Sequence, residues 1–230
     1  MIPGGFQKYK KLTFKKFIQK TLTLFVQEQW AGLGHYIVTE ASNILSERLI
    51  FQGSRILSCS LCRFSAPAFI HLSNSLGITW NSACPECNSR SRHRGLIFLY
   101  REYLQEKQAK KILQFAPEPV LENEIRKYKQ HQYFTTDYHM SGVDFPGEDI
   151  QNLSFADSSF DLVFSNHVLE HVPDDKQAVA ETARILKNGG VAIITLPGDW
   201  RRKLTRSFGH LNYNGHYREY GLDVIDLFRT

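Results

Sequence analysis

Apolar and polar positions follow two different periods in the second half of the chain. Short apolar runs typical of buried strands occur at 111–115, 132–136, 161–165 and 191–196. Between them, helical spacing predicts helices at 119–129 and 174–187, and Asn188-Gly189-Gly190 is expected to end the second helix. Strands such as "FDLVFS" (160–165) are almost continuously apolar, as strands covered on both faces are. This alternation predicts an α/β fold with a doubly wound, mostly parallel sheet.

The residues before position 110 follow other patterns. Apolar residues recur at helical spacing between lysines from Phe14 to Val26, a second helix is expected at 37–50, and 88–107 also has a helical pattern. We therefore expect three parts: a basic helical N-terminal extension over 1–54, a small cysteine module over 55–94 and the α/β domain over 95–230.

The four cysteines form two closely spaced pairs. "CSLC" (59–62) and "CPEC" (84–87) are two C-x2-C turns, and two such turns offer the four thiolates of a tetrahedral zinc site. We interpret Cys59, Cys62, Cys84 and Cys87 as ligands of a structural Zn²⁺ in a zinc-ribbon-like module. An iron site, a redox pair and a metal-free fold remain alternatives. So few cysteines, paired in this way, favour a reducing compartment.

The net charge of +5 is concentrated in two places. Six lysines precede the first acidic residue, Glu28, and a second basic stretch is "RSRHR" (90–94). The first could dock on the protein body, lie on a membrane surface or contact nucleic acid. The second could be a solvated face or a contact for RNA phosphate or a sugar nucleotide. No apolar run reaches about 18 residues and no signal peptide is recognised, so we expect a cytoplasmic protein, with peripheral membrane contact through the basic helix as an option.

The turn after the strand at 111–115 contains no glycine. It reads "FAPEP" (115–119), in which Pro117 and Pro119 have no N–H to donate. A dinucleotide fold needs glycines there so that amide groups approach a pyrophosphate, and Glu118 adds negative charge at that position. The turn therefore disfavours NAD, FAD and ATP. S-adenosylmethionine has no phosphate and carries a sulfonium and an ammonium, which suit a carboxylate; capping of the helix dipole is the other role open to Glu118.

The following segments resemble a known family. "EDIQNLSFADSSFD" (148–161) and "NHVLEHVPDD" (166–175), followed by "ETARILKNGGVAIITLP" (181–197), are similar to class I S-adenosylmethionine-dependent methyltransferases of the type 11 subgroup. The resemblance covers residues 110 to about 198. "CPEC", "RHRG", "LQFAPEP" and "FGHLNYNGHYREYG" further resemble a bacterial group that joins a cysteine-rich module to the methyltransferase domain.

This resemblance implies a set of cofactor-binding residues. Phe115, Ala116 and Glu118 would line the methionine end of the cofactor, and Asp137, at the end of "YFTTDY", would bind the ribose unless it serves only as a turn residue. Asp149 and Ile150 would bracket the adenine. Asn166 and His167 would face the sulfonium.

The family also implies a longer sheet. Its full sheet has two more strands than we predict, and "YGLDVIDLF" (220–228) looks like the helix before them. We therefore expect a domain that lacks its last strands and leaves the strand at 191–196 with a bare edge.

Methyl transfer needs a base only when the acceptor must lose a proton. The base candidates are His167, His171 and His216, with His210, Asp199 and Tyr217 as further options. "GHYREYG" (215–221) is expected to close over the site, unless it is a packed turn. The expected acceptor is an O or N nucleophile of a small molecule or glycan. An RNA methyltransferase and an inactive scaffold with a zinc-bearing binding module are the alternatives.

Overall fold

The computed structural model describes residues 30–49, 56–74, 77–212 and 214–229. The helix expected between Phe14 and Val26 lies outside these residues. The chain divides into two compact units, the first ending at Tyr103 and the second beginning at Leu104. The three-part division expected from the sequence stays a prediction.

The first unit combines short antiparallel strands with helices. It contains α3 (Trp30–Leu49), β1 (Leu57–Ser58), β2 (Ser65–Ala66), β3 (Ile70–Asn74), β4 (Gly77–Ala83) and most of α4 (Ser91–Leu104). β1 pairs with β2, and β3 pairs with β4. The Asn43 side chain on α3 bonds both backbone groups of His71 on β3, at 3.1 and 2.7 Å, which anchors the helix to the hairpin. The helices expected at 37–50 and 88–107 are therefore present, with shifted ends.

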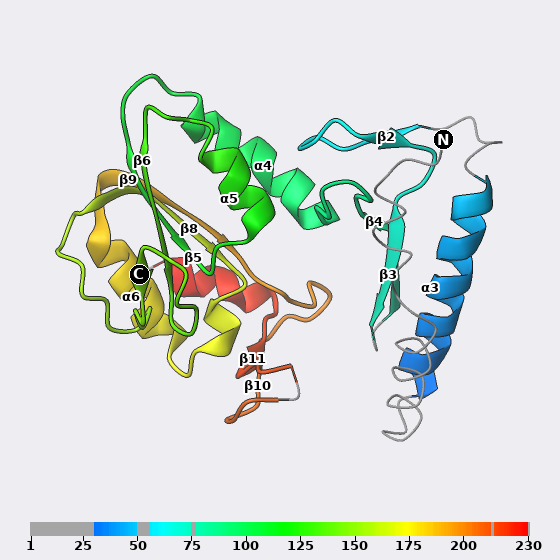
Figure 1. Cartoon of the computed structure of the whole chain (residues 1–230). Helices are drawn as coiled ribbons and strands as arrows, with labels where there is room; N and C mark the ends of the chain where they lie inside the picture. Colours follow the sequence, from blue (N-terminus) through cyan, green and yellow to red (C-terminus); the bar gives the residue numbers. More distant parts are fainter. Residues whose placement is uncertain (1–29, 50–55, 75–76, 213, 230) are drawn as a thin grey trace. The chain divides into compact units, whose positions relative to one another are not determined.

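The second unit is built on a five-stranded parallel sheet in the order β7-β6-β5-β8-β9 (Figure 1). The strands are β5 (Lys111–Phe115), β6 (Gln132–Asp137), β7 (Phe145–Pro146), β8 (Phe160–Asn166) and β9 (Leu186–Thr195). β5 and β8 lie at the centre, and this explains their nearly continuous apolar sequences. The parallel sheet predicted from the sequence is confirmed.

Helices cover the sheet on both sides. α5 (Pro119–Ile125) and α6 (Asp175–Ile185) lie on opposite faces in Figure 1. Leu113 and Val163 share one hydrophobic cluster with Ile185 of α6. The alternate residues Ile112 and Leu162 are also buried, as expected for neighbouring side chains that point to opposite faces of a strand.

Two details of the sheet differ from the sequence prediction. β7 was missed, because it has only two residues and both are exposed. Asn188, Gly189 and Gly190 do not end α6 directly: the helix ends at Ile185, and these residues fall within β9, where the pairing with β8 shifts register between Phe160 and Leu162. Gly189 has a φ of +76°, a left-handed conformation that favours glycine.

The segment after β9 is folded against the second unit. β10 (Arg206–Ser207) pairs with β11 (Arg218–Glu219), and the 3-10 helix η2 (Leu222–Phe228) follows. η2 occupies the stretch expected to be helical, and its Val224 joins the main hydrophobic cluster. Another 3-10 turn, η1 (Leu169–His171), follows β8. Among the described residues, no helix is long and apolar enough to cross a membrane.

Candidate functional site

A cavity of about 690 Å³ lies at the carboxyl ends of the central strands. It is within the size range of small-molecule sites, and ligands of open α/β sheets bind at this edge. Its walls come from the ends of β5, β6 and β8, the 148–151 segment, the η1 region and the 211–217 segment. The residues lining it are Phe115, Ala116, Asp137, Tyr138, His139, Glu148, Asp149, Ile150, Gln151, His167, Val168, His171, Val172, Pro173, Leu211, Gly215 and Tyr217.

Two of the strand ends have an unusual backbone. Ala116, directly after β5, has a φ of 45°, and His167, directly after β8, has a φ of 55°. Residues with a side chain seldom adopt this left-handed conformation, and such positions concentrate at functional sites. Backbone hydrogen bonds of 2.9 Å from Ala116 to Thr136 and from His167 to Thr195 hold both turns. The turn after β5 thus takes a path suited to glycine without containing one.

Asp137 ends β6 with its carboxylate at the cavity. Its Oδ1 accepts hydrogen bonds of 2.7 Å from the backbone amides of His139 and Met140, which fix the orientation of the group. Oδ2 accepts no hydrogen bond from the residues that the structure describes. Asp137 therefore presents an oriented acceptor to a ligand.

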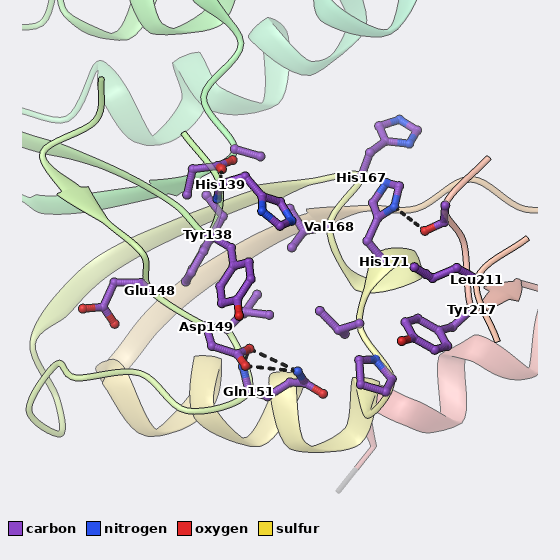
Figure 2. Close-up of a pocket in the computed structure, with 17 residues that line it drawn as sticks. Tyr138, His139, Glu148, Asp149, Gln151, His167, Val168, His171, Leu211 and Tyr217 are labelled. Carbon is purple, nitrogen blue, oxygen red and sulfur yellow. Dashed lines mark hydrogen bonds between the residues drawn. The ribbon is translucent and has the colours of Figure 1, made fainter. Parts of the chain in front are cut away.

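Asp149 and Gln151 form a polar pair in the wall of the cavity (Figure 2). The Gln151 side chain donates to Asp149 Oδ1 at 3.1 Å, and the Gln151 backbone donates to the same oxygen at 2.9 Å. Ile150 lies between them and is buried in the main hydrophobic cluster. An apolar side chain next to an amide and a carboxylate suits a flat heterocycle with polar edges.

Histidines gather around a buried glutamate on the opposite side. Glu170 is 1% exposed, and its Oε1 lies 3.3 Å from His167 Nδ1 and 3.9 Å from His171 Nε2. The rings of His171 and His216 are 4.8 Å apart in an edge-to-face arrangement. Burial lowers the pKa of His216; the charges of His171 and His167 add to this, and the Glu170 carboxylate opposes it. Burial thus favours the neutral imidazole of His216 beside this carboxylate.

Leu211, Gly215 and Tyr217 form the outer wall of the cavity, and the residues around Tyr217 are firmly attached to η1. Arg218 is buried and donates to the carbonyl oxygens of Leu169 and Val172 at 2.9 and 2.8 Å. The Tyr217 amide donates to Glu170 O at 2.7 Å. "GHYREYG" therefore contributes to the cavity through Gly215 and Tyr217, as a wall tied to η1.

The structure brings together most of the site residues expected from the sequence. Phe115, Ala116, Asp137, Asp149, Ile150, His167 and His171 all line the cavity. Glu118, Asn166 and His216 do not. Glu118 stands at the N-cap of α5 without making a capping hydrogen bond, Asn166 is buried and accepts from Thr195 at 3.1 Å, and His216 lies behind His171.

Several lining residues were missed by the sequence analysis. Tyr138 and His139 directly follow Asp137, and Glu148 and Gln151 flank the Asp149-Ile150 pair. Their position next to expected residues was the available signal. Glu170 lies between two histidines of the "NHVLEH" motif, but nothing in the motif indicates that its side chain is buried.

The four cysteines converge in the first unit. Cys59 Sγ lies 3.7 Å from Cys87 Sγ, and Cys62 Sγ lies 3.6 Å from Cys84 Sγ. With Zn–S bonds of about 2.3 Å, the edge of a tetrahedron is about 3.8 Å. The sulfur positions therefore fit a tetrahedral metal centre with four thiolate ligands.

The two cysteine turns share one backbone geometry. The first cysteine of each turn accepts a 2.9 Å hydrogen bond from the amide four residues later, at Arg63 and at Asn88. Both of these residues are left-handed, with φ values of 61° and 58°. This repeated turn directs both sulfurs of each pair to the same point.

Ser89 supports the cysteine cluster from within the core. It is fully buried, and its hydroxyl lies 3.2 Å from Cys59 Sγ and 3.1 Å from Cys87 Sγ. Burial acts to raise the pKa of Cys59, but hydrogen bonds from the Cys62 backbone and the Ser89 hydroxyl outweigh it and lower this pKa to about 7. Burial raises the pKa of Cys62 to about 11. A cation would be needed to ionise all four thiols together.

The basic stretch beside the second cysteine turn is partly used inside the unit. Arg94 donates to the carbonyl oxygens of Ser89 and Asn81 at 2.6 and 3.2 Å and stacks over Phe69 at 4.9 Å. His93 is buried and accepts from the Arg90 amide at 3.2 Å. Arg94 and His93 therefore have structural roles.

The comparisons with known proteins concern mainly the second unit. Residues 100–194 match the family model described as a methyltransferase domain. The chain is 31% identical over 101 residues to the methyltransferase GfsG of Streptomyces halstedii, a match covering 37% of this chain and 36% of that protein. It is 35% identical over 88 residues to the malonyl-[acyl-carrier protein] O-methyltransferase of Nitrosospira multiformis, covering 38% of this chain and 28% of that protein. The matches thus span about a third of these relatives.

Among solved structures, the chain is similar to a Burkholderia thailandensis N1-methyltransferase of 1,6-didemethyltoxoflavin that contains S-adenosylhomocysteine. The TM-score is 0.48 at 17% identity, over 60% of this chain and 66% of that chain. The matched segment 100–194 contains β5 to β8, most of β9 and much of the cavity wall. Residues 100–194 are therefore similar to a methyltransferase domain and fold on a Rossmann-like parallel sheet, and neither observation identifies an acceptor.

Proposed function

We propose that the cavity binds S-adenosylmethionine and that the protein transfers its methyl group to a nucleophile of a separate acceptor molecule. The observation that carries this proposal is the charge of the cavity. Asp137, Glu148 and Asp149 line it, and the lining residues that the structure describes include no lysine or arginine. Such a cavity attracts a sulfonium and an ammonium and repels phosphates.

The turn at Ala116 supports the same cofactor. Its left-handed backbone keeps the chain path close to the cavity, while Pro117 and Pro119 provide no amide hydrogens for a pyrophosphate. Asp137 is suited to the ribose hydroxyls through its oriented carboxylate. Asp149, Ile150 and Gln151 are suited to the adenine.

The acceptor would approach from the side of His167, His171 and Tyr217. Methyl transfer is an in-line displacement in which the cofactor supplies the reactive group and the protein supplies alignment. His167 is a candidate base for a hydroxyl acceptor, because it lines the cavity directly after β8. We favour a small-molecule or glycan-type acceptor over RNA, because Arg94 and His93 are engaged within the first unit.

Calorimetric titration of the full chain tests the cofactor. S-adenosylmethionine and S-adenosylhomocysteine should both bind, whereas ATP and NADH should not. Asp137→Asn should weaken binding about tenfold or more, because a charged acceptor of the ribose hydroxyls is lost. Asp226→Asn, which removes the same charge outside the cavity lining, is the matched control. Binding of ATP or NADH, or equal losses in both variants, would contradict the proposal.

We also propose that Cys59, Cys62, Cys84 and Cys87 bind a structural Zn²⁺. The sulfur spacing and the two matching turns support a closed tetrahedral site. Four thiolate ligands leave no position for a substrate, so this metal would stabilise the first unit and take no part in methyl transfer.

A further inference from the structure

We propose that Glu170, His171 and His216 form a second metal site, which binds a divalent ion such as Zn²⁺ at the wall of the cavity. One ligand atom from each residue lies within 4.8 Å of the others. Two imidazoles and one carboxylate are a donor set suited to borderline divalent ions. The binding of this ion does not depend on the proposed methyl transfer.

The buried glutamate is the first observation in favour of a cation. The Glu170 side chain is 1% exposed, and its Oε2 is buried without a hydrogen-bond partner among the described residues. The other oxygen, Oε1, has His167 Nδ1 at 3.3 Å. A buried carboxylate oxygen that is left unsatisfied is costly and indicates an ion or water. The nearby Arg218 bonds backbone carbonyl oxygens and lies 3.4 Å from Asp175. A bound cation would supply the missing compensation.

The orientation of His171 is the second observation. Its Nδ1 lies 2.7 Å from the carbonyl oxygen of Gly215, so Nδ1 carries the hydrogen in the neutral ring. This leaves the lone pair on Nε2, which lies 3.9 Å from Glu170 Oε1. The distance is too long for a hydrogen bond. Two ligands that each bind one tetrahedral ion at about 2.1 Å are about 3.4 Å apart, so a shift of about 0.5 Å would bring both atoms to one ion.

The backbone holds the three residues in position before any ion binds. Glu170 and His171 lie in η1, and His216 reaches them from a distant part of the chain. Hydrogen bonds attach the residues on both sides of His216 to η1. His171 Nδ1 bonds the carbonyl oxygen of Gly215, and the Tyr217 amide donates to Glu170 O at 2.7 Å. Metal sites need this support, because a loosely held ligand binds weakly.

His171 also connects the site to the cavity, which it lines. Three protein ligands leave at least one coordination position for water or for an oxygen of a bound molecule. His167 Nδ1, 3.3 Å from the same Glu170 oxygen, lies at the edge of the group.

Metal binding is tested on the full chain with its cysteine site already loaded with zinc. Equilibrium dialysis against buffered Zn²⁺ should show a second, weaker equivalent. Glu170→Gln and His216→Ala should each lower the affinity for the second Zn²⁺ ion at least tenfold and leave the affinity for the first ion unchanged. His139→Ala is the matched control, because it removes a cavity histidine that is outside the group. Binding of Co²⁺ as the second equivalent should add no thiolate-to-metal absorption.

Other results would overturn the proposal. These are the absence of a second equivalent in the wild type, unchanged binding in His216→Ala, or an equal loss in His139→Ala. If Glu170→Gln fails to fold, the dialysis result for His216→Ala decides whether the second metal site exists. The dialysis contains no S-adenosylmethionine, so a failure here leaves the calorimetric test of cofactor binding unaffected.

Discussion

At the scale of single residues, Ala116 explains how a turn without glycine can border a ligand cavity. Alanine is the smallest residue with a Cβ, and it tolerates the φ of 45° at a cost of about 1 kcal/mol. His167 adopts a similar conformation at the end of the neighbouring strand. Both residues line the cavity, so the energy cost is concentrated at the proposed binding site.

Replacement of Ala116 by glycine should therefore stabilise the protein or leave its stability unchanged. We expect the free energy of unfolding to rise by up to about 1 kcal/mol, because glycine adopts the left-handed conformation without a steric cost. Ala180→Gly, on the exposed face of α6, is the control and should lower this free energy by about 1 kcal/mol. Denaturant unfolding of both variants measures the difference. Similar losses in the two variants would contradict the account of Ala116.

The sequence could predict the part of the site that lies near the strand ends, because the residue types there carry the signal. Asp137 and Asp149 carry charges at places where the fold puts the carboxyl ends of strands. Glu170 could not be found in this way, because its importance depends on burial and on the approach of His216. That approach depends on long-range packing, which the local pattern does not encode.

At the scale of elements, the Arg218 side chain adds to the backbone contacts between η1 and the segment around β11. Arg218 bonds the carbonyl oxygens of Leu169, the first residue of η1, and of Val172, which directly follows η1. It also lies 3.4 Å from Asp175 at the start of α6. One guanidinium thus joins the end of η1 to the start of α6.

Arg218→Met should lower the free energy of unfolding by about 2–4 kcal/mol, because methionine fills similar space but donates no hydrogen bonds. Arg206→Met is a suitable control, since Arg206 is exposed on the paired strand β10. Thermal and denaturant unfolding measure both variants. A loss below about 0.5 kcal/mol in Arg218→Met would show that the outer wall is held by other contacts.

Most elements of the parallel sheet could be predicted because their apolar patterns were strong, whereas the short strands β1 to β4 of the first unit were not predicted. The central strands β5 and β8 are buried on both faces and were found almost to the residue. β7 was missed because two exposed residues carry no periodic signal. The end of α6 was misjudged, because the glycines after it serve a register shift within β9 and not the helix terminus.

At the scale of the whole molecule, the two units have separate cores. The cysteines and Phe69 belong to a cluster in the first unit, whereas Leu113 and Val163 belong to the main cluster of the second. The two expected ligands, zinc at the cysteines and S-adenosylmethionine at the cavity, would each bind to one unit. Their effects on stability should therefore be separable.

Removal of zinc should loosen the first unit and leave the sheet intact. In hydrogen exchange measured by mass spectrometry, a chelator or Cys84→Ser should increase exchange in β3 and β4 but not in β5 or β8. Glu86→Gln, between the cysteines of the second turn and exposed, is the matched control and should change neither region. Increased exchange in β5 and β8 to the same degree would contradict independent ligand effects.

The attachment of Arg218 has a consequence for how small molecules reach the cavity. The outer wall, with Leu211 and Tyr217, is bonded to η1 and should move only together with it. Tyr138, whose side chain is 60% exposed, stands across from the His171 side in Figure 2. Entry and exit should therefore proceed past Tyr138, and a bulky group attached at that rim would slow the exchange of one molecule for the next.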